Sequence, residues 1–323
     1  MTLILLEIGV RIYAYSIGRG FFDNPQSFLS PFFTTDEIPA PYADGNDRVF
    51  KEGERVTVEK RPGEVRVVCF GGSTTLPAHD PEAYSYPHGL RDLLAERFPN
   101  ATVTVLNAGG NGFSSAHTLV NLSLRVLEIQ PDIITIYHNI NDLSVNYFGK
   151  RATSDYGNKY LTSYYLGFRH RSGLWGALAR VSRLARIATN RVELLQFGYE
   201  DYDTKRDYAV GSRFFRRNLE SIVAVARAHE VDIVLGTQAA RKGQREDPGF
   251  MLYNSIVRSV AHDANVPLAE VAERVVAESD FVDDVHYTSR GARAVAQVWN
   301  EPVAALVAKH LSTPSSASTP VPR

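Results

Sequence analysis

The sequence predicts an α/β fold, a three-layer α/β/α sandwich around a central parallel sheet. Short apolar runs alternate with segments of helical spacing along most of the chain. A chain of 323 residues is long for one domain and short for two full-sized domains. Several apolar runs also end in small or polar residues, and ligands bind at the carboxyl ends of the strands in such sheets. We therefore expect one domain with its site at that edge.

Two segments precede this alternation. Residues 1–18 are apolar, but Glu7 and Arg11 interrupt them, so they match neither a secretory signal nor a spanning helix of about 20 apolar residues. They are either the remnant of a membrane anchor or a helix packed on the domain. We expect the anchor, and with it membrane association and a location in the cell envelope. Residues 19–63, rich in Pro, Asp, Gly and aromatics, predict an extended lead-in with a hairpin.

The main domain is expected over residues 64–311. Apolar runs predict strands, and spacings of three and four between apolar residues predict helices. The elements expected in its first half are strand 64–70, helix 86–98, strand 102–109, helix 115–129 and strand 131–139. Those expected in its second half are helix 214–230, strand 231–238, helix 250–265, a short strand and helix within 266–275, and helix 289–311.

An insertion over residues 143–212 interrupts the domain, because no core strand pattern occurs there. Within it, residues 173–188 place Leu174, Leu178, Val181 and Ala185 on one helical side and Arg180, Arg183 and Arg186 elsewhere. This pattern fits either an amphipathic element facing a membrane or an anionic glycan, or a cap helix with solvated arginines. We expect the cap helix. Residues 312–323, rich in Ser, Thr and Pro, predict a disordered tail.

Composition excludes few classes of protein. The 35 basic and 36 acidic residues give a net charge of −1, so nothing points to nucleic acid or to an acidic substrate. The single cysteine, Cys69, cannot form an internal disulfide and lies in an apolar run, where a packing role is expected. It does not reveal the compartment.

Polar residues that could take part in catalysis follow four of the predicted strands and loops. The strand in VVCFGGSTT (67–75) ends just before Ser73, and the next is followed by the glycine-rich NAGGNGFSS (107–115). The third leads into HNIND, which contains Asn141, and Asp283 stands three residues before His286, ahead of the last helix. A nucleophile, a base, an orienting carboxylate and amide donors are what acyl transfer requires.

Each feature alone has a simpler explanation. Gly-Gly-Ser can be only a turn, Asn-Asp a helix cap, the histidine structural and the glycine-rich segment a tight connection. Their occurrence at successive strand or loop ends, in one order, favours catalysis.

These segments resemble the SGNH (GDSL-type) hydrolases over residues 65–142 and 213–310. FGGST (70–74) is similar to the family's first block and implies that Ser73 is the nucleophile. NAGGNG (107–112) implies Gly112 as an oxyanion donor, and the third block implies Asn141 as another. Asp-x-x-His implies Asp283 and His286. Two positions depart from the family pattern: Gly72 replaces an aspartate, as in a familiar bacterial variant, and Asn139 stands where glycine is usual.

The resemblance also implies a flavodoxin-like fold and a serine esterase mechanism without cofactor or metal. The other histidines considered, at positions 79, 88, 117 and 138, are not spaced as a ligand set. His138, Asn139 and Tyr287, which neighbour the blocks, are candidate substrate-binding residues, although packing is the simpler role for His138. The oligomeric state is not predicted.

The expected substrate is a small-molecule or glycan ester with a short acyl group, such as an O-acetyl group on an envelope glycan. Two alternatives stay open. The same residues would serve an O-acyltransferase that passes the acyl group to a sugar hydroxyl. A non-catalytic glycan-binding or assembly protein on this fold is the other, but the presence of all the catalytic-type residues disfavours it.

Overall fold

The computed structural model describes residues 2–16, 42–50, 53–76, 84–147, 152–160, 182, 184–185 and 208–312. The chain divides into two compact units. One combines Met1–Ile38 with Ser144–Gly211, and the other combines Pro39–Leu143 with Ser212–Arg323. The segment predicted as an insertion therefore groups with the N-terminal segment. Most of the predicted cap helix, and residues 313–323 of the predicted tail, lie outside the described residues.

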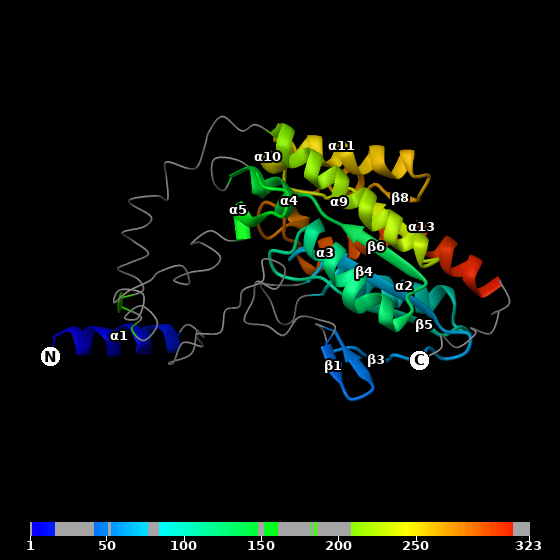
Figure 1. Ribbon diagram of the computed structural model, residues 1–323, viewed down its shortest axis with the longest axis horizontal. Coiled ribbons are helices and arrows are strands. Elements are labelled where there is room, and N and C mark those ends of the chain that lie inside the picture. The colour runs from blue at the N-terminus through cyan, green and yellow to red at the C-terminus, as the bar shows by residue number, and fades with distance from the viewer. Residues whose placement is uncertain are drawn as a thin grey trace. The chain divides into compact units, whose positions relative to one another are not determined.

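The second unit is built around a parallel sheet of five strands (Figure 1). The strands are β4 (Val65–Gly71), β5 (Val103–Asn107), β6 (Ile133–Tyr137), β7 (Asp232–Gly236) and β8 (Leu268–Ala269). Their order is β5-β4-β6-β7-β8, and every neighbouring pair is parallel. The first strand thus lies between the second and third, which is the flavodoxin-like order with a switch point beside β4. The predicted α/β fold is confirmed.

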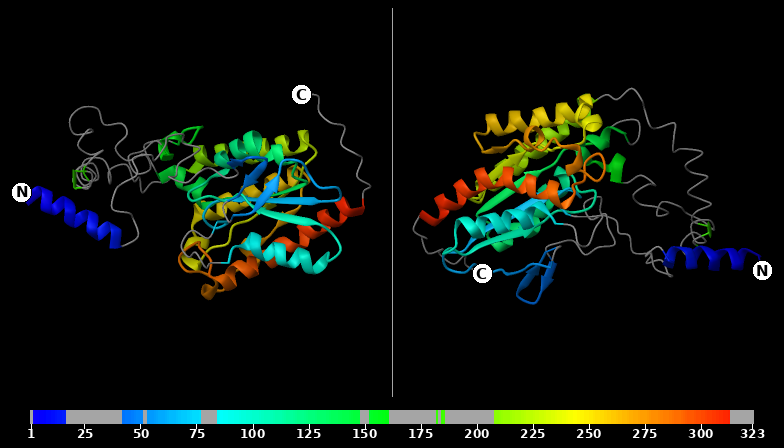
Figure 2. Two further views of the ribbon diagram at one scale, coloured as in Figure 1. Left: turned by 90° about the horizontal axis from the view of Figure 1, so that it is seen from below. Right: turned by 180° about the vertical axis from the view of Figure 1, so that it is seen from behind.

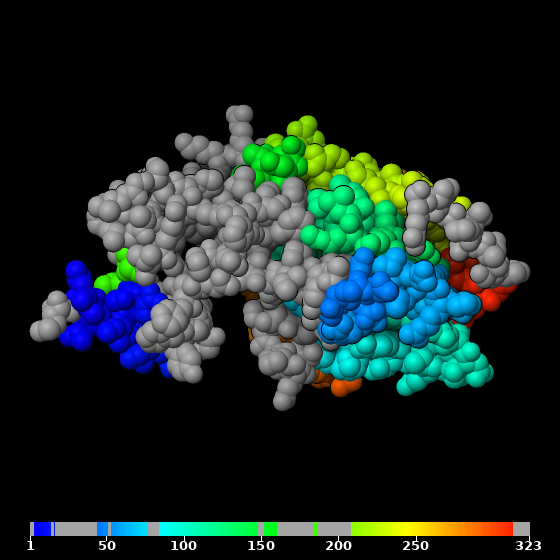
Figure 3. Space-filling model, turned by 60° about the horizontal axis from the view of Figure 1, so that its bottom comes forward, coloured from blue at the N-terminus to red at the C-terminus, as the bar shows by residue number. Residues whose placement is uncertain are grey.

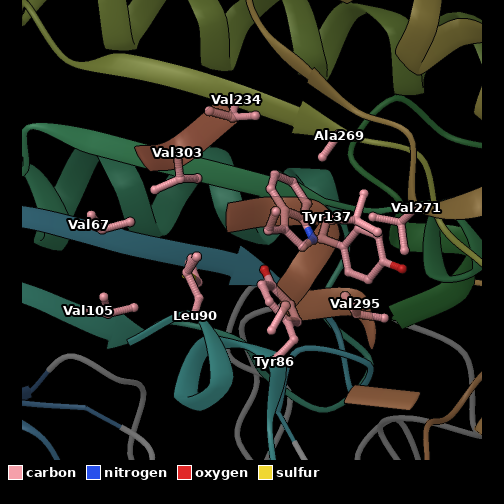
Figure 4. Close-up of a cluster of buried hydrophobic side chains, with 14 of the residues drawn as sticks. Val67, Tyr86, Leu90, Val105, Tyr137, Val234, Ala269, Val271, Val295 and Val303 are labelled. Carbon is pink, nitrogen blue, oxygen red and sulfur yellow. The ribbon is translucent and has the colours of Figure 1, made fainter. Parts of the chain in front are cut away.

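Helices cover both faces of the sheet. The long ones are α2 (Tyr86–Arg97), α3 (Ser115–Asn121), α9 (Tyr208–Ala228), α11 (Pro248–Asp263) and α13 (Ser289–Ser312). Figure 2 shows α2 and α13 side by side on one side of the sheet, and α9 and α11 on the other. On the α2 and α13 side, Val67 and Val105 of the sheet pack with Leu90, Val295 and Val303 of the helices (Figure 4).

The opposite face has its own packing. Successive side chains of a strand point to opposite faces, so Val68 and Phe70 face away from α2 and α13. There Phe215 of α9 stacks on Tyr253 of α11 with ring centroids 4.9 Å apart, and both rings are buried. Each face of the sheet is therefore sealed by helices, and only its edges and strand ends remain for a site.

Short elements make the connections. They are the helices α4 (Ile140–Leu143), α5 (Gly157–Tyr160), α10 (Lys242–Arg245) and α12 (Val271–Arg274), and the turns η3 (Ser144–Tyr147) and η5 (Glu278–Asp280). The helix predicted over 115–129 consists of α3, a π-helical turn η1 (Leu122–Val126) and a 3₁₀ turn η2 (Leu127–Ile129). Leu122, Val126 and Ile129 stay buried across the wider turn.

The hairpin predicted within 19–63 is found as a small antiparallel sheet. It consists of β1 (Tyr42–Asp44), β2 (Asp47–Val49) and β3 (Arg55–Thr57). The guanidinium of Arg48 donates to both carboxylate oxygens of Glu128, at 2.6 and 2.8 Å. In Figure 3 the blue atoms of this sheet lie on the surface of the second unit.

Helix α1 (Thr2–Ser16) belongs to the first unit, and most of its apolar side chains are exposed, Leu3 and Ile4 by 71% and 66%. Its Glu7 pairs with Arg11 at 2.7 Å and also accepts a hydrogen bond from the Ser182 hydroxyl at 2.8 Å. Of the helices described, none combines the length and the apolar character needed to cross a bilayer. Membrane association stays a prediction.

Candidate active site

The turn after β4 places a serine at the carboxyl edge of the sheet. The amides of Thr75 and Leu76 both donate to the Gly72 carbonyl, at 3.0 and 3.1 Å, which folds the chain back directly after Ser73. A Cβ on Gly71 would lie 1.9 Å from Thr75 Oγ1 and 2.9 Å from the Tyr137 carbonyl. Only glycine fits there, because the turn folds against the end of its own strand.

A continuous hydrogen-bonded chain runs from this serine to a carboxylate. Ser73 Oγ lies 2.8 Å from His286 Nε2, and His286 Nδ1 lies 2.7 Å from Asp283 Oδ2. The other oxygen, Asp283 Oδ1, accepts from the amides of Val285 and His286, at 2.9 and 2.8 Å. The predicted Ser73, Asp283 and His286 are thus brought together across 213 residues of sequence.

The electrostatics of Asp283 favour a charged carboxylate. Burial raises the pKa of this carboxyl, but hydrogen bonds from the Val285 and His286 amides and from the His286 imidazole outweigh burial. The net result is a pKa below the ordinary value. A carboxylate that only accepts holds the imidazole proton on Nδ1, which leaves His286 Nε2 able to accept the proton of Ser73.

The glycine-rich turn after β5 meets the turn that carries Asn141. The side-chain amide of Asn141 donates to the Phe113 carbonyl at 2.9 Å, and the Gly110 amide donates to the Gly71 carbonyl at 3.2 Å. Gly112 adopts a φ of 70°, in the left-handed region that favours glycine.

Gly72, the second glycine of the turn that carries Ser73, leaves room for the Asn141 side chain. A Cβ on Gly72 would lie 2.4 Å from Asn141 Nδ2 and 3.1 Å from the Phe113 carbonyl oxygen. Asn141 therefore reaches the backbone of the turn that carries Ser73. The arrangement can carry out acyl transfer: a nucleophile, a base, an orienting carboxylate and amide donors converge at one edge of the sheet.

The sequence model of the GDSL-like lipase/acylhydrolase family matches residues 69–294, which is more than half of the chain. The chain belongs to this family. It is a carboxylic ester hydrolase, and its catalytic-type residues fall within the matched range.

Several solved structures are similar to this acylhydrolase. A protein assigned as a GDSL-like lipase from Parabacteroides merdae is 14% identical, with a TM-score of 0.49 over 76% of this chain and 98% of that chain. An acetylxylan esterase from Geobacillus stearothermophilus is 16% identical, with a TM-score of 0.48 over 77% and 94%. An alpha/beta hydrolase from the metagenome of Lake Arreo is 16% identical, with a TM-score of 0.46 over 77% and 97%. No curated protein sequence matches the chain.

Two of the candidate substrate-binding residues of the acylhydrolase are buried. His138 is 2% exposed, and its Nε2 lies 2.7 Å from Thr118 Oγ1. Asn139 is 1% exposed and donates from Nδ2 to the Phe250 carbonyl at 2.9 Å and to Asn254 Oδ1 at 3.0 Å. These contacts favour packing for both, so substrate binding by either stays a prediction.

The third candidate, Tyr287, anchors the loop that carries His286. Its hydroxyl lies 2.6 Å from the Tyr137 hydroxyl and donates to the Ala239 carbonyl at 3.3 Å. Burial and the neighbouring Tyr137 raise the pKa of Tyr287 well above its ordinary value, so it stays a neutral donor. The Arg241 amide also donates to the Asp284 carbonyl at 2.9 Å, which holds the same loop from β7.

Sequence reasoning missed a buried network behind Asn141. Asp142 is fully buried and accepts from the Ser115 amide at 3.1 and 3.2 Å and from the Ser115 hydroxyl. Asn218 of α9 in turn donates to Ser115 Oγ at 2.9 Å. The network joins α4 to α3 and α9. The Asn-Asp pair was its only sequence signal, and a helix cap explained that pair equally well.

The acylhydrolase shows no cluster of metal ligands in the part of the chain that the structure describes. His88 lies on α2 beside Tyr84, with ring centroids 4.7 Å apart, and His117 stacks on Phe113 at 4.7 Å. His79 lies outside the described residues.

Proposed function

We propose that the protein is a serine esterase in which Ser73 is the nucleophile, His286 the general base and Asp283 the residue that orients the imidazole. The observation that carries this proposal is the continuous hydrogen-bonded chain through these three side chains, with distances of 2.8 and 2.7 Å. The ionised state of Asp283 supports the same assignment, because an acceptor is needed opposite Nδ1.

In the first half of the reaction, His286 Nε2 takes the proton of Ser73 as Oγ forms a bond to the ester carbonyl carbon. The carbonyl oxygen becomes an oxyanion. His286 then gives its proton to the leaving alcohol as the carbon–oxygen bond of the ester breaks, and an acyl group remains on Ser73. In the second half, His286 removes a proton from water as the water oxygen forms a bond to the acyl carbon. His286 then returns this proton to Ser73 Oγ as the bond between Oγ and the acyl carbon breaks, which releases the acid and restores the enzyme.

The proposed oxyanion donors are the backbone amides of Ser73 and Gly112 and the side-chain amide of Asn141. Their turns are tied together through the Phe113 carbonyl, which accepts from Asn141 next to Gly112. Fixed donors of this kind need no rearrangement as charge develops, which is why they stabilise the transition state.

For the substrate we propose a short acyl ester, acetyl first, carried by a carbohydrate. The basis is the sequence resemblance to bacterial Gly-Ser-Thr members of the family. A small-molecule or glycan ester is then the partner, and the reaction uses no cofactor and no nucleic acid.

The acyl preference is tested with p-nitrophenyl acetate, butyrate and octanoate and the purified protein. We expect kcat/KM for acetate to exceed that for octanoate by roughly tenfold or more, because a pocket sized for acetyl excludes additional methylenes. A preference for octanoate would reject the short-acyl proposal. If a folded protein releases no p-nitrophenol from any ester, the hydrolase reaction itself is rejected in favour of an acyltransferase that needs its own donor.

Replacing Asn141 by alanine tests the oxyanion role. We expect kcat for p-nitrophenyl acetate to fall by roughly 10²- to 10³-fold, with little change in KM, because a donor used mainly in the transition state is lost. Asn46→Ala, which removes an exposed amide from the small sheet, serves as the matched control. An unchanged kcat in folded Asn141→Ala enzyme would exclude Asn141 as an oxyanion donor.

A further inference from the structure

Gln238 lies just after β7 and bridges two turns of the active site. Its side chain is buried, with 1% of the residue exposed. Gln238 Nε2 donates to Thr74 Oγ1 at 3.2 Å, directly after Ser73. Gln238 Oε1 accepts from the Ile140 amide at 2.9 Å, directly before Asn141. One side chain thus touches the neighbour of the nucleophile and the neighbour of the proposed oxyanion donor.

The chemistry of these contacts fixes the orientation of the amide. The Ile140 N–H can only donate, so the atom facing it must be the carbonyl oxygen of Gln238. The NH₂ group then faces Thr74, whose hydroxyl oxygen can accept. A flipped amide would place donor against donor at Ile140, and both hydrogen bonds of the Gln238 side chain would be lost.

The backbone of Gln238 is itself held in place. Its amide donates to Asn254 Oδ1 at 2.9 Å, and its carbonyl accepts from Asn254 Nδ2 at 2.9 Å. Asn254 Oδ1 also accepts from Asn139 Nδ2 at 3.0 Å. The bridge therefore connects the two turns to α11, and it is not a loose side chain that settles between them.

The turn that carries Asn141 needs such support. Helix α4 has only 4 residues, too few for helical hydrogen bonds to stabilise it alone. Ile140 is its first residue, and the amides in a first turn have no partner within the helix. Gln238 supplies that partner from β7, and in doing so fixes α4 against the residue that follows Ser73.

We propose that Gln238 is a positioning residue of the oxyanion hole: it sets the distance between the Ser73 turn and Asn141 by binding both neighbours at once. This inference rests on the proposed function, in which Asn141 binds the oxyanion. Gln238 itself touches no reacting atom. Its effect on the reaction is therefore expected to pass through Asn141.

The test is a double-mutant cycle with p-nitrophenyl acetate. Gln238→Met keeps the length of the side chain and removes both hydrogen bonds. We expect kcat to fall by roughly 10²-fold with little change in KM, since a misplacement of about 1 Å can cost that much. Combined with Asn141→Ala, the losses should be clearly less than multiplicative, because the second change removes the group that the first one misplaces.

Variants of Thr74 test the same bridge at the hydroxyl that accepts from Gln238. They replace the first test if Gln238→Met does not fold. Thr74→Val removes the hydroxyl that accepts from Gln238 and should lower kcat. Thr74→Ser keeps the hydroxyl and should have a kcat close to that of the wild type. A role in packing alone would not separate these two variants in this way, because valine is closer to threonine in volume than serine is.

Thr237→Val is the matched control for stability. Thr237 is also buried, but its hydroxyl faces away from the site, donating to Glu270 at 3.0 Å and accepting from the Ala272 amide at 3.1 Å. We expect a lower Tm with kcat close to that of the wild type. Multiplicative losses in the cycle would overturn this inference and leave the proposed function unaffected. A fall in kcat for Thr237→Val as large as that for Gln238→Met would do the same. An unchanged Asn141→Ala enzyme would instead overturn the proposed oxyanion role, and this inference with it.

Discussion

Replacing Ser73 by alanine is expected to lower kcat for p-nitrophenyl acetate by at least about 10⁴-fold. The reason is that, in the proposed mechanism, the His286 imidazole activates this hydroxyl, which lies at the end of the hydrogen-bonded chain. The remaining rate would come from the oxyanion donors and from binding. The measurement is p-nitrophenol release by the wild type and the variant at equal concentrations.

The fold should survive this change. Ser73 is only partly buried, and the turn is held by the amides of Thr75 and Leu76, which alanine does not disturb. We therefore expect a Tm close to that of the wild type. Ser255→Ala, which removes a hydroxyl from the exposed face of α11, is the matched control and should retain full activity. Full turnover by Ser73→Ala would reject the whole catalytic assignment.

Asp283→Asn is expected to lower kcat by about 10³- to 10⁴-fold, an effect of the size seen when a catalytic triad loses its carboxylate. The amides of Val285 and His286 both point at Oδ1 and require an acceptor, so the amide oxygen of asparagine would take that place. Its NH₂ group then faces His286 Nδ1, which must accept. The imidazole proton moves to Nε2, and the base can no longer take the proton of Ser73.

The same variant has a predicted effect on stability in acid. The pKa of Asp283 is lower in the folded protein than its ordinary value. Between these two pKa values the unfolded chain binds more protons, so the free energy of unfolding rises with pH there. The contribution is present above about pH 4 and is lost as the pH falls through the lowered value.

Urea unfolding at a series of acidic pH values measures this contribution. The wild type should lose more stability than Asp283→Asn as the pH falls below about 4, because asparagine does not titrate. Parallel pH profiles for the two proteins would show that the carboxylate is not stabilised by its hydrogen bonds. The difference should be modest, since about half of the Asp283 side chain, 53%, is exposed to solvent, which screens its interactions.

Sequence predicted the sheet and the nucleophile turn well, for a physical reason. A strand buried on both faces must be apolar along its length, so the point where polarity returns, after Gly71 or Tyr137, marks the strand end. Parallel strands bring those ends to one edge. The spacing of Asp283 and His286 could also be interpreted, because a carboxylate three residues before a histidine can reach its Nδ1 within one turn.

The supports of the site could not be predicted in the same way. Gln238 acts through two hydrogen bonds to residues far from it in sequence, and no local pattern distinguishes such a glutamine from an exposed one. Asn139 stands where glycine is usual in the family, and no local pattern shows that its side-chain amide donates to Phe250 and Asn254 of α11. The contact between Glu7 and Ser182 could not be predicted from the sequence either, since it joins residues 175 positions apart.

Helix α13 closes the face of the sheet that Val67, Leu90 and Val303 fill, and it follows His286 in the chain. While the chain is being made, β4 and α2 emerge from the ribosome long before that helix does. Their apolar surface stays open to solvent, or to chaperones, for most of synthesis. In the proposed mechanism, Ser73 and its base His286 are separated by 213 residues of sequence. We therefore expect no ester hydrolysis by a nascent chain until nearly all of this domain has been translated.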